Sequence, residues 1–140
     1  MSKFSQRSLD SLKGVHPNLV KVMNEAIKDT PYDFTITEGV RTVARQQQLY
    51  AQGRTTKGAI VTNTDGIKNK SNHQPKSDGY GYAVDLYPFY NGSVQVSDKE
   101  VIPRLRAIAK HIKSTGKRLG IEIDAGVDWK FFDAPHFQLK

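Results

Sequence analysis

The sequence predicts a small α+β domain in which a short antiparallel sheet is flanked by helices. Two long segments carry apolar residues at helical spacing, and several shorter segments alternate or cluster apolar residues as strands do. At 140 residues the chain is long enough to bury about two thirds of its unfolded surface in one core. We therefore expect residues 1–140 to form a single domain.

The first two predicted helices are bounded by residues typical of helix ends. Residues 17–29 begin at Pro17, which suits a first helical turn. Their apolar positions form a core-facing stripe: Leu19, Val20, Met23, Ala26 and Ile27. A second helix over 43–52 is expected to be capped by Thr42 and ended by Gly53.

The longest helix is predicted within residues 98–119. Its apolar face comprises Leu105, Ile108, Ala109, Ile112 and Leu119. Ser97 and Glu100 have the spacing of a capping box. However, Pro103 would interrupt a helix begun there, so we expect the main helix to start at Pro103.

Strands are predicted at 33–40, where Phe34 and Ile36 alternate with polar residues, and at 82–88 (YAVDLYP), which is followed by an Asn91-Gly92 turn. Residues 121–124 and 136–139 read as short strands. Between them, residues 54–80 are polar and lack periodicity. A loop of that length in a small domain is usually functional or mobile, and because it leads into His73 we expect function.

Charge and composition narrow the classes of partner. The net charge of +7 favours a polyanion such as nucleic acid, an anionic membrane surface or a bacterial cell wall, although many soluble domains are modestly basic. The basic residues form no dense run and no reading helix, which argues against nucleic acid. No segment approaches the ~18 apolar residues of a membrane span, and the N-terminus lacks the apolar core of a secretory signal. Without cysteine, thiolate zinc sites and cysteine nucleophiles are excluded.

Two segments concentrate candidate catalytic residues: SNHQPKSDGYGYAVDL, with His73 and Asp85, and DAPHFQL, with Asp133 and His136. Two imidazoles and one carboxylate suit a catalytic zinc, because three protein ligands leave a tetrahedral position open for water. Asp133, three residues before the last histidine, is placed to handle that water's proton.

Each of these residues has a more ordinary role when taken alone. In the strand 82–88, Asp85 points to the face opposite Val84 and Leu86, where a buried carboxylate needs a cation or several donors. An ion pair with a lysine or arginine is the commoner solution. A lone histidine is more often a surface or hydrogen-bonded core residue, and His16 and His111 are given that role. The metal hypothesis rests on the joint context.

These segments resemble the zinc D,D-peptidase superfamily, which includes VanY-type carboxypeptidases, VanX-type dipeptidases and phage L-alanyl-D-glutamate endopeptidases. The resemblance spans roughly residue 33 to the end and rests on three ordered motifs. The shared Ser-x-His…Gly-x-Ala-x-Asp, Gly-x-Arg-Thr and acidic-x-x-His motifs are matched by Ser71, His73, Gly81, Ala83 and Asp85, by Gly39, Arg41 and Thr42, and by Asp133 and His136.

Two positions depart from the family pattern. The gap between His73 and Gly81 is longer, which suggests an inserted hairpin or loop that returns to the same strand. The usual Gly-Gly-Asp-Trp reads Gly126-Val127-Asp128-Trp129, and Val127 needs a different backbone angle from glycine.

The resemblance implies a role for each site residue. Zn²⁺ would be held by His73, Asp85 and His136, with water as the fourth ligand. Asp133 would act as general base, or alternatively orient His136. Arg41 would steady the substrate or the developing oxyanion, with a surface cation as the alternative. Ser71 would bind the substrate backbone or orient His73. Trp129 could line the cleft, although a single tryptophan more often packs.

The function implied is that of a bacteriophage endolysin, a monomeric zinc endopeptidase that cuts the L-Ala–D-Glu bond of peptidoglycan stem peptides. Such an enzyme would be made in the host cytoplasm without a signal peptide, would lack a separate wall-binding domain and stable membrane association, and would reach the wall after release. The alternatives are a D-Ala–D-Ala carboxypeptidase or dipeptidase, and a non-catalytic module that binds wall or nucleic acid. A structural zinc would need a fourth protein ligand.

Overall fold

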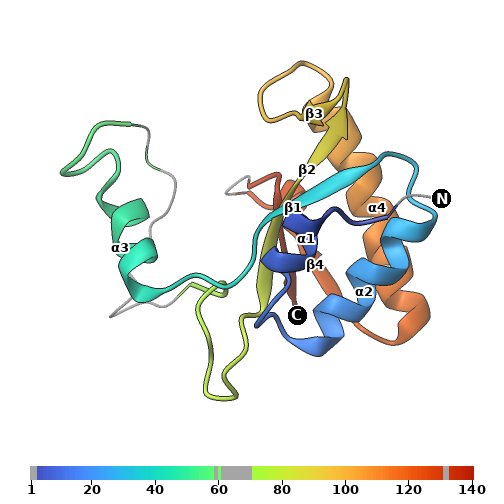
Figure 1. Ribbon diagram of the computed structural model, residues 1–140, viewed down its shortest axis with the longest axis horizontal. Coiled ribbons are helices and arrows are strands. Elements are labelled where there is room, and N and C mark those ends of the chain that lie inside the picture. The colour runs from blue at the N-terminus through green and yellow to red at the C-terminus, as the bar shows by residue number, and fades with distance from the viewer. Residues whose placement is uncertain (1–2, 59, 61–70, 131–132) are drawn as a thin grey trace.

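A five-stranded antiparallel sheet organises the chain, in the order β1-β2-β5-β4 with β3 paired to the far end of β2 (Figure 1). The computed structural model describes residues 3–58, 60, 71–130 and 133–140. The fold is a small single α+β domain, as predicted. Its elements are α1 (Gln6–Ser11), α2 (Pro17–Lys28), β1 (Phe34–Glu38), α3 (Val43–Ala51), β2 (Ala83–Tyr90), β3 (Ser93–Val94), α4 (Val101–Leu119), β4 (Ile123–Ala125), the 3₁₀ turn η1 (Gly126–Asp128) and β5 (His136–Leu139).

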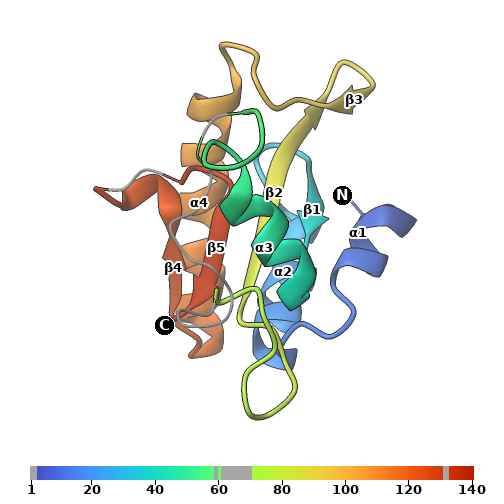
Figure 2. The same cartoon turned by 90° about the vertical axis from the view of Figure 1, so that its left-hand side faces the viewer.

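The hydrophobic core lies between the sheet and the helices α2 and α4, which pack together on one of its faces (Figure 1). Helix α3 stands on the other side of the sheet, in front of β2 and β5 in Figure 2. The predicted apolar faces are confirmed, with Val20 and Leu119 at the margins of the core. Burying each large apolar side chain contributes about 1.5–3 kcal/mol. The largest of these side chains are Leu19, Met23, Ile36, Leu86, Leu105, Ile108, Ile112 and Phe137.

The start of α4 differs from the prediction. The helix begins at Val101, after Glu100 as N-cap, and not at Pro103. Proline is tolerated there because the amides of the first helical turn have no partner within the helix. The Ser97–Glu100 capping box does not form, since Glu100 itself is the N-cap and no side chain caps the helix.

Strand β4 also starts later than predicted, at Ile123 and not at Ile121. Gly120 ends α4 in the left-handed conformation (φ 75°), and the Ile121 amide donates to the carbonyl of Gly116 at 2.8 Å. This is the hydrogen-bond pattern that closes many helices. Residue 121 is therefore part of the helix ending and cannot begin the strand.

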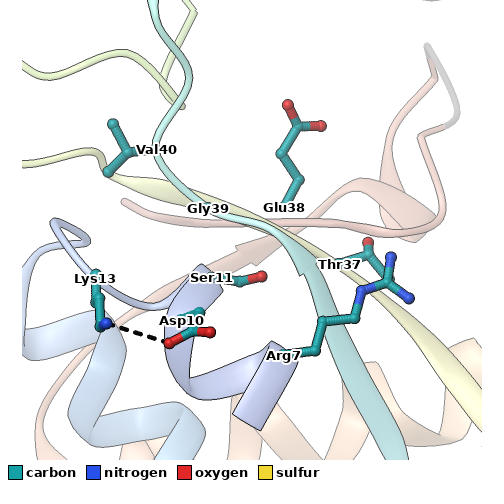
Figure 3. Close-up of a pocket in the computed structure, with 8 residues that line it drawn as sticks. All are labelled: Arg7, Asp10, Ser11, Lys13, Thr37, Glu38, Gly39 and Val40. Atoms are coloured by element: carbon teal, nitrogen blue, oxygen red, sulfur yellow. Dashed lines mark ion pairs between the residues drawn. The ribbon is translucent and has the colours of Figure 1, made fainter.

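The first helix, α1, is too short and polar to be predicted from its sequence, but it protects the sheet. Its Ser8 hydroxyl accepts a hydrogen bond from the Ile36 amide at 3.0 Å, on the outer edge of β1. An unpaired strand edge would otherwise be free to bind another chain. Figure 3 shows the pocket between α1 and β1, where Asp10 and Lys13 form an exposed ion pair and Glu38 points away from that pair.

The predicted Asn91-Gly92 turn joins β2 to β3, with both residues at positive φ (54° and 79°). Such a pair gives the twist that a two-residue hairpin requires. Within the described ranges, no helix is long and apolar enough to cross a membrane.

Candidate metal centre

Three predicted ligands converge on the sheet face opposite the core. His73 lies in the connection before β2, Asp85 lies within β2, and His136 is the first residue of β5, directly paired with Asp85. One ligand atom from each lies within 4.8 Å of the others. The Oδ1 atom of Asp85 is 3.2 Å from His73 Nε2 and 3.5 Å from His136 Nδ1. The fold therefore brings together residues that are up to 63 positions apart (136 minus 73).

The hydrogen bonds on the far sides of the two rings determine what faces this centre. His73 Nδ1 lies 2.9 Å from the carbonyl oxygen of Gly39, and His136 Nε2 lies 2.8 Å from Oε1 of Gln138. Because those oxygens only accept, each outer nitrogen carries the hydrogen. In the neutral rings the inner nitrogens, His73 Nε2 and His136 Nδ1, are then electron-pair donors aimed at a carboxylate.

This arrangement suits a cation. Among the described residues, His73 Nε2 and Asp85 Oδ1 are buried atoms without a hydrogen-bond partner. Buried polar atoms are almost always partnered, and three electron-pair donors that face one another repel unless positive charge lies between them. Two imidazoles and one carboxylate are a common ligand set for catalytic zinc. The residues therefore fit a divalent metal of this type.

The shifted pKa values of Asp85 and His136 indicate that this site favours positive charge. Burial acts to raise the pKa of the Asp85 carboxyl, but contacts with His136 and His73 outweigh it and hold that pKa well below its usual range. Burial acts to lower the pKa of His136, yet the adjacent Asp85 carboxylate raises it above its usual value. The metal-free site thus attracts a proton, which a metal ion would replace.

Two glycines permit the close backbone approaches on which the site depends. A Cβ atom at Gly39 would lie 1.8 Å from the carbonyl oxygen of Ser11. The close approach matters because the carbonyl of this same glycine contacts the His73 ring. A Cβ atom at Gly126 would lie 2.0 Å from the carbonyl oxygen of Asp133. Any larger residue would displace the backbone at both positions, so these glycines serve packing and not chain flexibility.

Asp133 lies at the rim of the centre. Its Oδ2 atom is 3.9 Å from His136 Nδ1, and its side chain is 40% exposed. That distance is too long for a hydrogen bond, whereas the His136 ring makes a hydrogen bond to Gln138 on its other side. Burial, followed by the negative charge of Asp85, raises the pKa of the Asp133 carboxyl. A carboxylate in this position can exchange a proton with a group bound at the centre.

Arg41 is buried and reaches the centre, but most of its donors are occupied. Its Nε and Nη2 atoms donate to the two carboxylate oxygens of Glu38, both at 3.0 Å, and Nη1 donates to Gln46 at 2.8 Å. Nη2 also lies 3.6 Å from Oδ2 of Asp85. The bidentate face of the guanidinium is therefore turned to Glu38, and Arg41 places a positive charge beside Asp85.

Sequence reasoning missed Glu38 and Gln46. Strict alternation from the buried Ile36 would send Glu38 into the core. The pairing of β1 with β2 is irregular between these two residues, and this bulge turns the side chain of Glu38 toward Arg41. Gln46 lies in α3 and is fully buried, a position that the polar sequence of that helix does not suggest.

Ser71 contacts the backbone of His73. Its hydroxyl accepts a hydrogen bond from the His73 amide at 3.2 Å. The extra residues before Gly81 form the predicted excursion: the Lys76 amide donates to the carbonyl of Tyr80, and the chain returns to β2. Of the polar segment 54–80, residues 59 and 61–70 lie outside the described part of the structure.

The Gly126–Trp129 segment also borders the centre. Val127 is buried within η1 and does not adopt the positive φ that glycine would allow, as expected. The Trp129 ring lies 5.0 Å from the His136 ring, and its Nε1 donates to Asp124 at 2.9 Å. The indole therefore packs against a candidate ligand. His16 and His111 have the surface or hydrogen-bonding roles expected of them. His16 caps α2, and Nε2 of His111 contacts Asp29 and the Ala26 carbonyl.

Comparison with known proteins gives consistent findings. A family model for the phage L-alanyl-D-glutamate peptidase matches residues 1–139. The chain is 34% identical over 138 residues to the L-alanyl-D-glutamate peptidase of Escherichia phage T5, covering 99% of this chain and 89% of that protein. It is 32% identical to the peptidoglycan L-alanyl-D-glutamate endopeptidase CwlK of Bacillus subtilis (strain 168), covering 96% and 81%. The crystal structure of the Serratia marcescens L-Ala D-Glu endopeptidase ChiX superposes with a TM-score of 0.77 at 30% identity, covering 98% of this chain and 89% of that one.

Proposed function

Because the chain belongs to the phage L-alanyl-D-glutamate peptidase family, we propose that it is a zinc-dependent endopeptidase that hydrolyses the L-Ala–D-Glu bond of peptidoglycan stem peptides. The observation that carries the zinc dependence is the convergence of His73, Asp85 and His136, in which the buried atoms His73 Nε2 and Asp85 Oδ1 have no hydrogen-bond partner. The biological role that fits is an endolysin that acts on the cell wall.

His73 Nε2, His136 Nδ1 and the Asp85 carboxylate would hold the metal. Zinc supplies Lewis acidity there, which polarises a carbonyl oxygen and lowers the pKa of water. The protein's part is to fix these three ligands. The Gly39 carbonyl and Gln138 lie within hydrogen-bond distance of the outer ring nitrogens, and the sheet pairing places Asp85 directly beside His136.

Asp133 is proposed as the general base. It would accept a proton from the attacking water and then deliver it to the leaving amine of the cleaved bond. Its place at the rim, 3.9 Å from His136 Nδ1, supports this role, as does its half-exposed carboxylate. We expect Asp133→Asn to lower turnover by about 10²–10⁴-fold while leaving zinc affinity nearly unchanged. Asp98→Asn is the matched control, because Asp98 is an exposed acid that accepts a hydrogen bond from the Tyr90 hydroxyl, near the β2–β3 hairpin. Near-normal turnover in Asp133→Asn would remove it as the base.

Arg41 and Ser71 are proposed to support substrate binding in different ways. Three donors of Arg41 are committed to Glu38 and Gln46, so it would act through its charge and its remaining N–H groups on the substrate or the developing oxyanion. Ser71 would act by holding the His73 backbone, the contact that its hydroxyl makes.

Mass spectrometry of digested muropeptides tests the scissile bond. The proposal expects new N-terminal D-Glu products, which disappear with a chelator and return on addition of zinc. Release of terminal D-Ala with L-Ala–D-Glu intact would instead identify a carboxypeptidase. Wall binding without any cleavage, and indifferent to the chelator, would identify a binding module.

A further inference from the structure

We infer that Gln138 and Asn72 are positioning residues that hold His136 in the tautomer whose Nδ1 faces the metal centre. This inference rests on the proposed zinc site, which it extends outward by two side chains. Neither residue belongs to the sequence motifs that identified the ligands.

One oxygen atom connects the two residues to the ligand. Oε1 of Gln138 lies 2.8 Å from Nε2 of His136 and also accepts a hydrogen bond from Nδ2 of Asn72 at 2.8 Å. Gln138 lies two residues after His136 in β5, so their side chains share one face of the strand. All three side chains are at least half-buried, so water competes weakly for these contacts.

The Asn72 contact decides which end of the Gln138 amide faces the histidine. An amide group offers an oxygen that accepts and a nitrogen that donates, and either can be turned toward a ring. Because the Asn72 nitrogen donates to Oε1, it is the oxygen of Gln138 that faces His136. The ring nitrogen Nε2 must then carry the hydrogen, which leaves the lone pair on Nδ1, on the side of Asp85. With the other tautomer, an N–H group would point into the centre and exclude a metal.

The same contact ties together the two segments that carry the histidines. Asn72 precedes His73 in the chain, and its carbonyl accepts a hydrogen bond from the Tyr82 amide at 2.7 Å, next to β2. Gln138 pairs with Ala83 across β2 and β5. The Asn72–Gln138 hydrogen bond therefore links the backbone at His73 to the strand of His136 and fixes the separation of the two rings.

The test measures zinc affinity by competition with a chromophoric chelator, and the His136 tautomer by long-range ¹H–¹⁵N correlation, on the full chain. Gln138→Leu removes the acceptor at similar size and should weaken zinc binding by about 10–100-fold. Gln138→Glu keeps the acceptor and should retain the affinity. Gln95→Leu is the matched control, because Gln95 contacts Tyr90 and Ser93 on the distant β2–β3 hairpin.

Wild-type protein provides a readout that needs no variant. At alkaline pH, metal-free His136 should carry its hydrogen on Nε2, and in Asn72→Leu the Nδ1–H form should become populated. The inference is overturned if the wild type shows Nδ1–H, or if Gln138→Leu binds zinc as tightly as the wild type. Failure of the proposed function looks different: the wild type itself would then bind no zinc or leave muropeptides uncut.

Discussion

Removal of the metal should destabilise the folded protein, and the structure sets the size of the effect. Without a cation, two buried atoms of the described structure, His73 Nε2 and Asp85 Oδ1, have no hydrogen-bond partner. An unsatisfied buried polar group costs about 1–3 kcal/mol, so the two together correspond to roughly 2–6 kcal/mol. A ligand present at a thousand times its Kd stabilises by about 4.1 kcal/mol, which falls in the same range.

The assay is calorimetric unfolding of the same preparation with zinc and with a chelator. For a domain of this size, each kcal/mol shifts Tm by about 3–4 °C, so we expect zinc to raise Tm by on the order of 10 °C. His73→Ala should abolish the shift, because it removes a ligand. His111→Ala should retain it, since His111 contacts the end of α2.

Two results would refute this reasoning. Equal Tm values with zinc and with chelator would mean that the buried atoms are satisfied without a cation. A full zinc shift in His73→Ala would mean that the stabilising ion binds elsewhere on the protein. Magnesium serves as a further control, because it prefers oxygen ligands and should give little shift.

Three further predictions address the same centre and the surface. Asp85 raises the pKa of His136 in the metal-free protein, so a proton competes with zinc for Nδ1 up to a higher pH than usual. Zinc affinity should therefore fall by about tenfold per pH unit below that raised pKa, and an affinity that does not change with pH in the competition assay would contradict this. In Arg41→Lys, the lysine cannot contact both oxygens of Glu38, so the free energy of unfolding measured with denaturant should fall by about 1.5–3 kcal/mol and kcat/KM should also fall. Unaltered kinetics would remove Arg41 from the site. Helix α4 carries six basic residues and no acidic one, so the double variant Lys110→Glu, Lys117→Glu should co-sediment less with anionic cell walls, and the loss should be larger at low salt. Its cleavage of soluble muropeptides should be unchanged, and equal losses in both assays would argue against a surface effect.

Patterns with a simple period were sufficient to predict the scaffold of the site. Alternation in 82–88 placed Val84 and Leu86 in the core and Asp85 on the opposite face, and the structure confirms both. The last strand, 136–139, was predicted with its observed limits. His73, Asp85 and His136 were predicted as a set, and the structure brings them together, in part because β5 pairs with β2 at Asp85.

What the sequence could not indicate depends on irregular backbone or on contacts between distant residues. The bulge after Ile36 has no local sequence marker, so Glu38 was missed. Helix α1 covers the edge of β1 through the hydrogen bond between Ser8 and Ile36, and these residues are 28 positions apart in the chain. Gln138 could have been found, since a residue two positions after a strand ligand shares its face. Its contact with Asn72, 66 residues away, could not.

The excursion between His73 and β2 has a practical consequence. Its turn is closed by the hydrogen bond from the Lys76 amide to the Tyr80 carbonyl. At its base, the Tyr82 amide donates a hydrogen bond to the Asn72 carbonyl. The length of the excursion is thus decoupled from the placement of His73. Because residues 75–80 are exposed, an epitope tag or a fluorescent reporter grafted near Ser77 should leave hydrolysis intact. This makes the loop a suitable attachment point for following the protein on isolated cell walls.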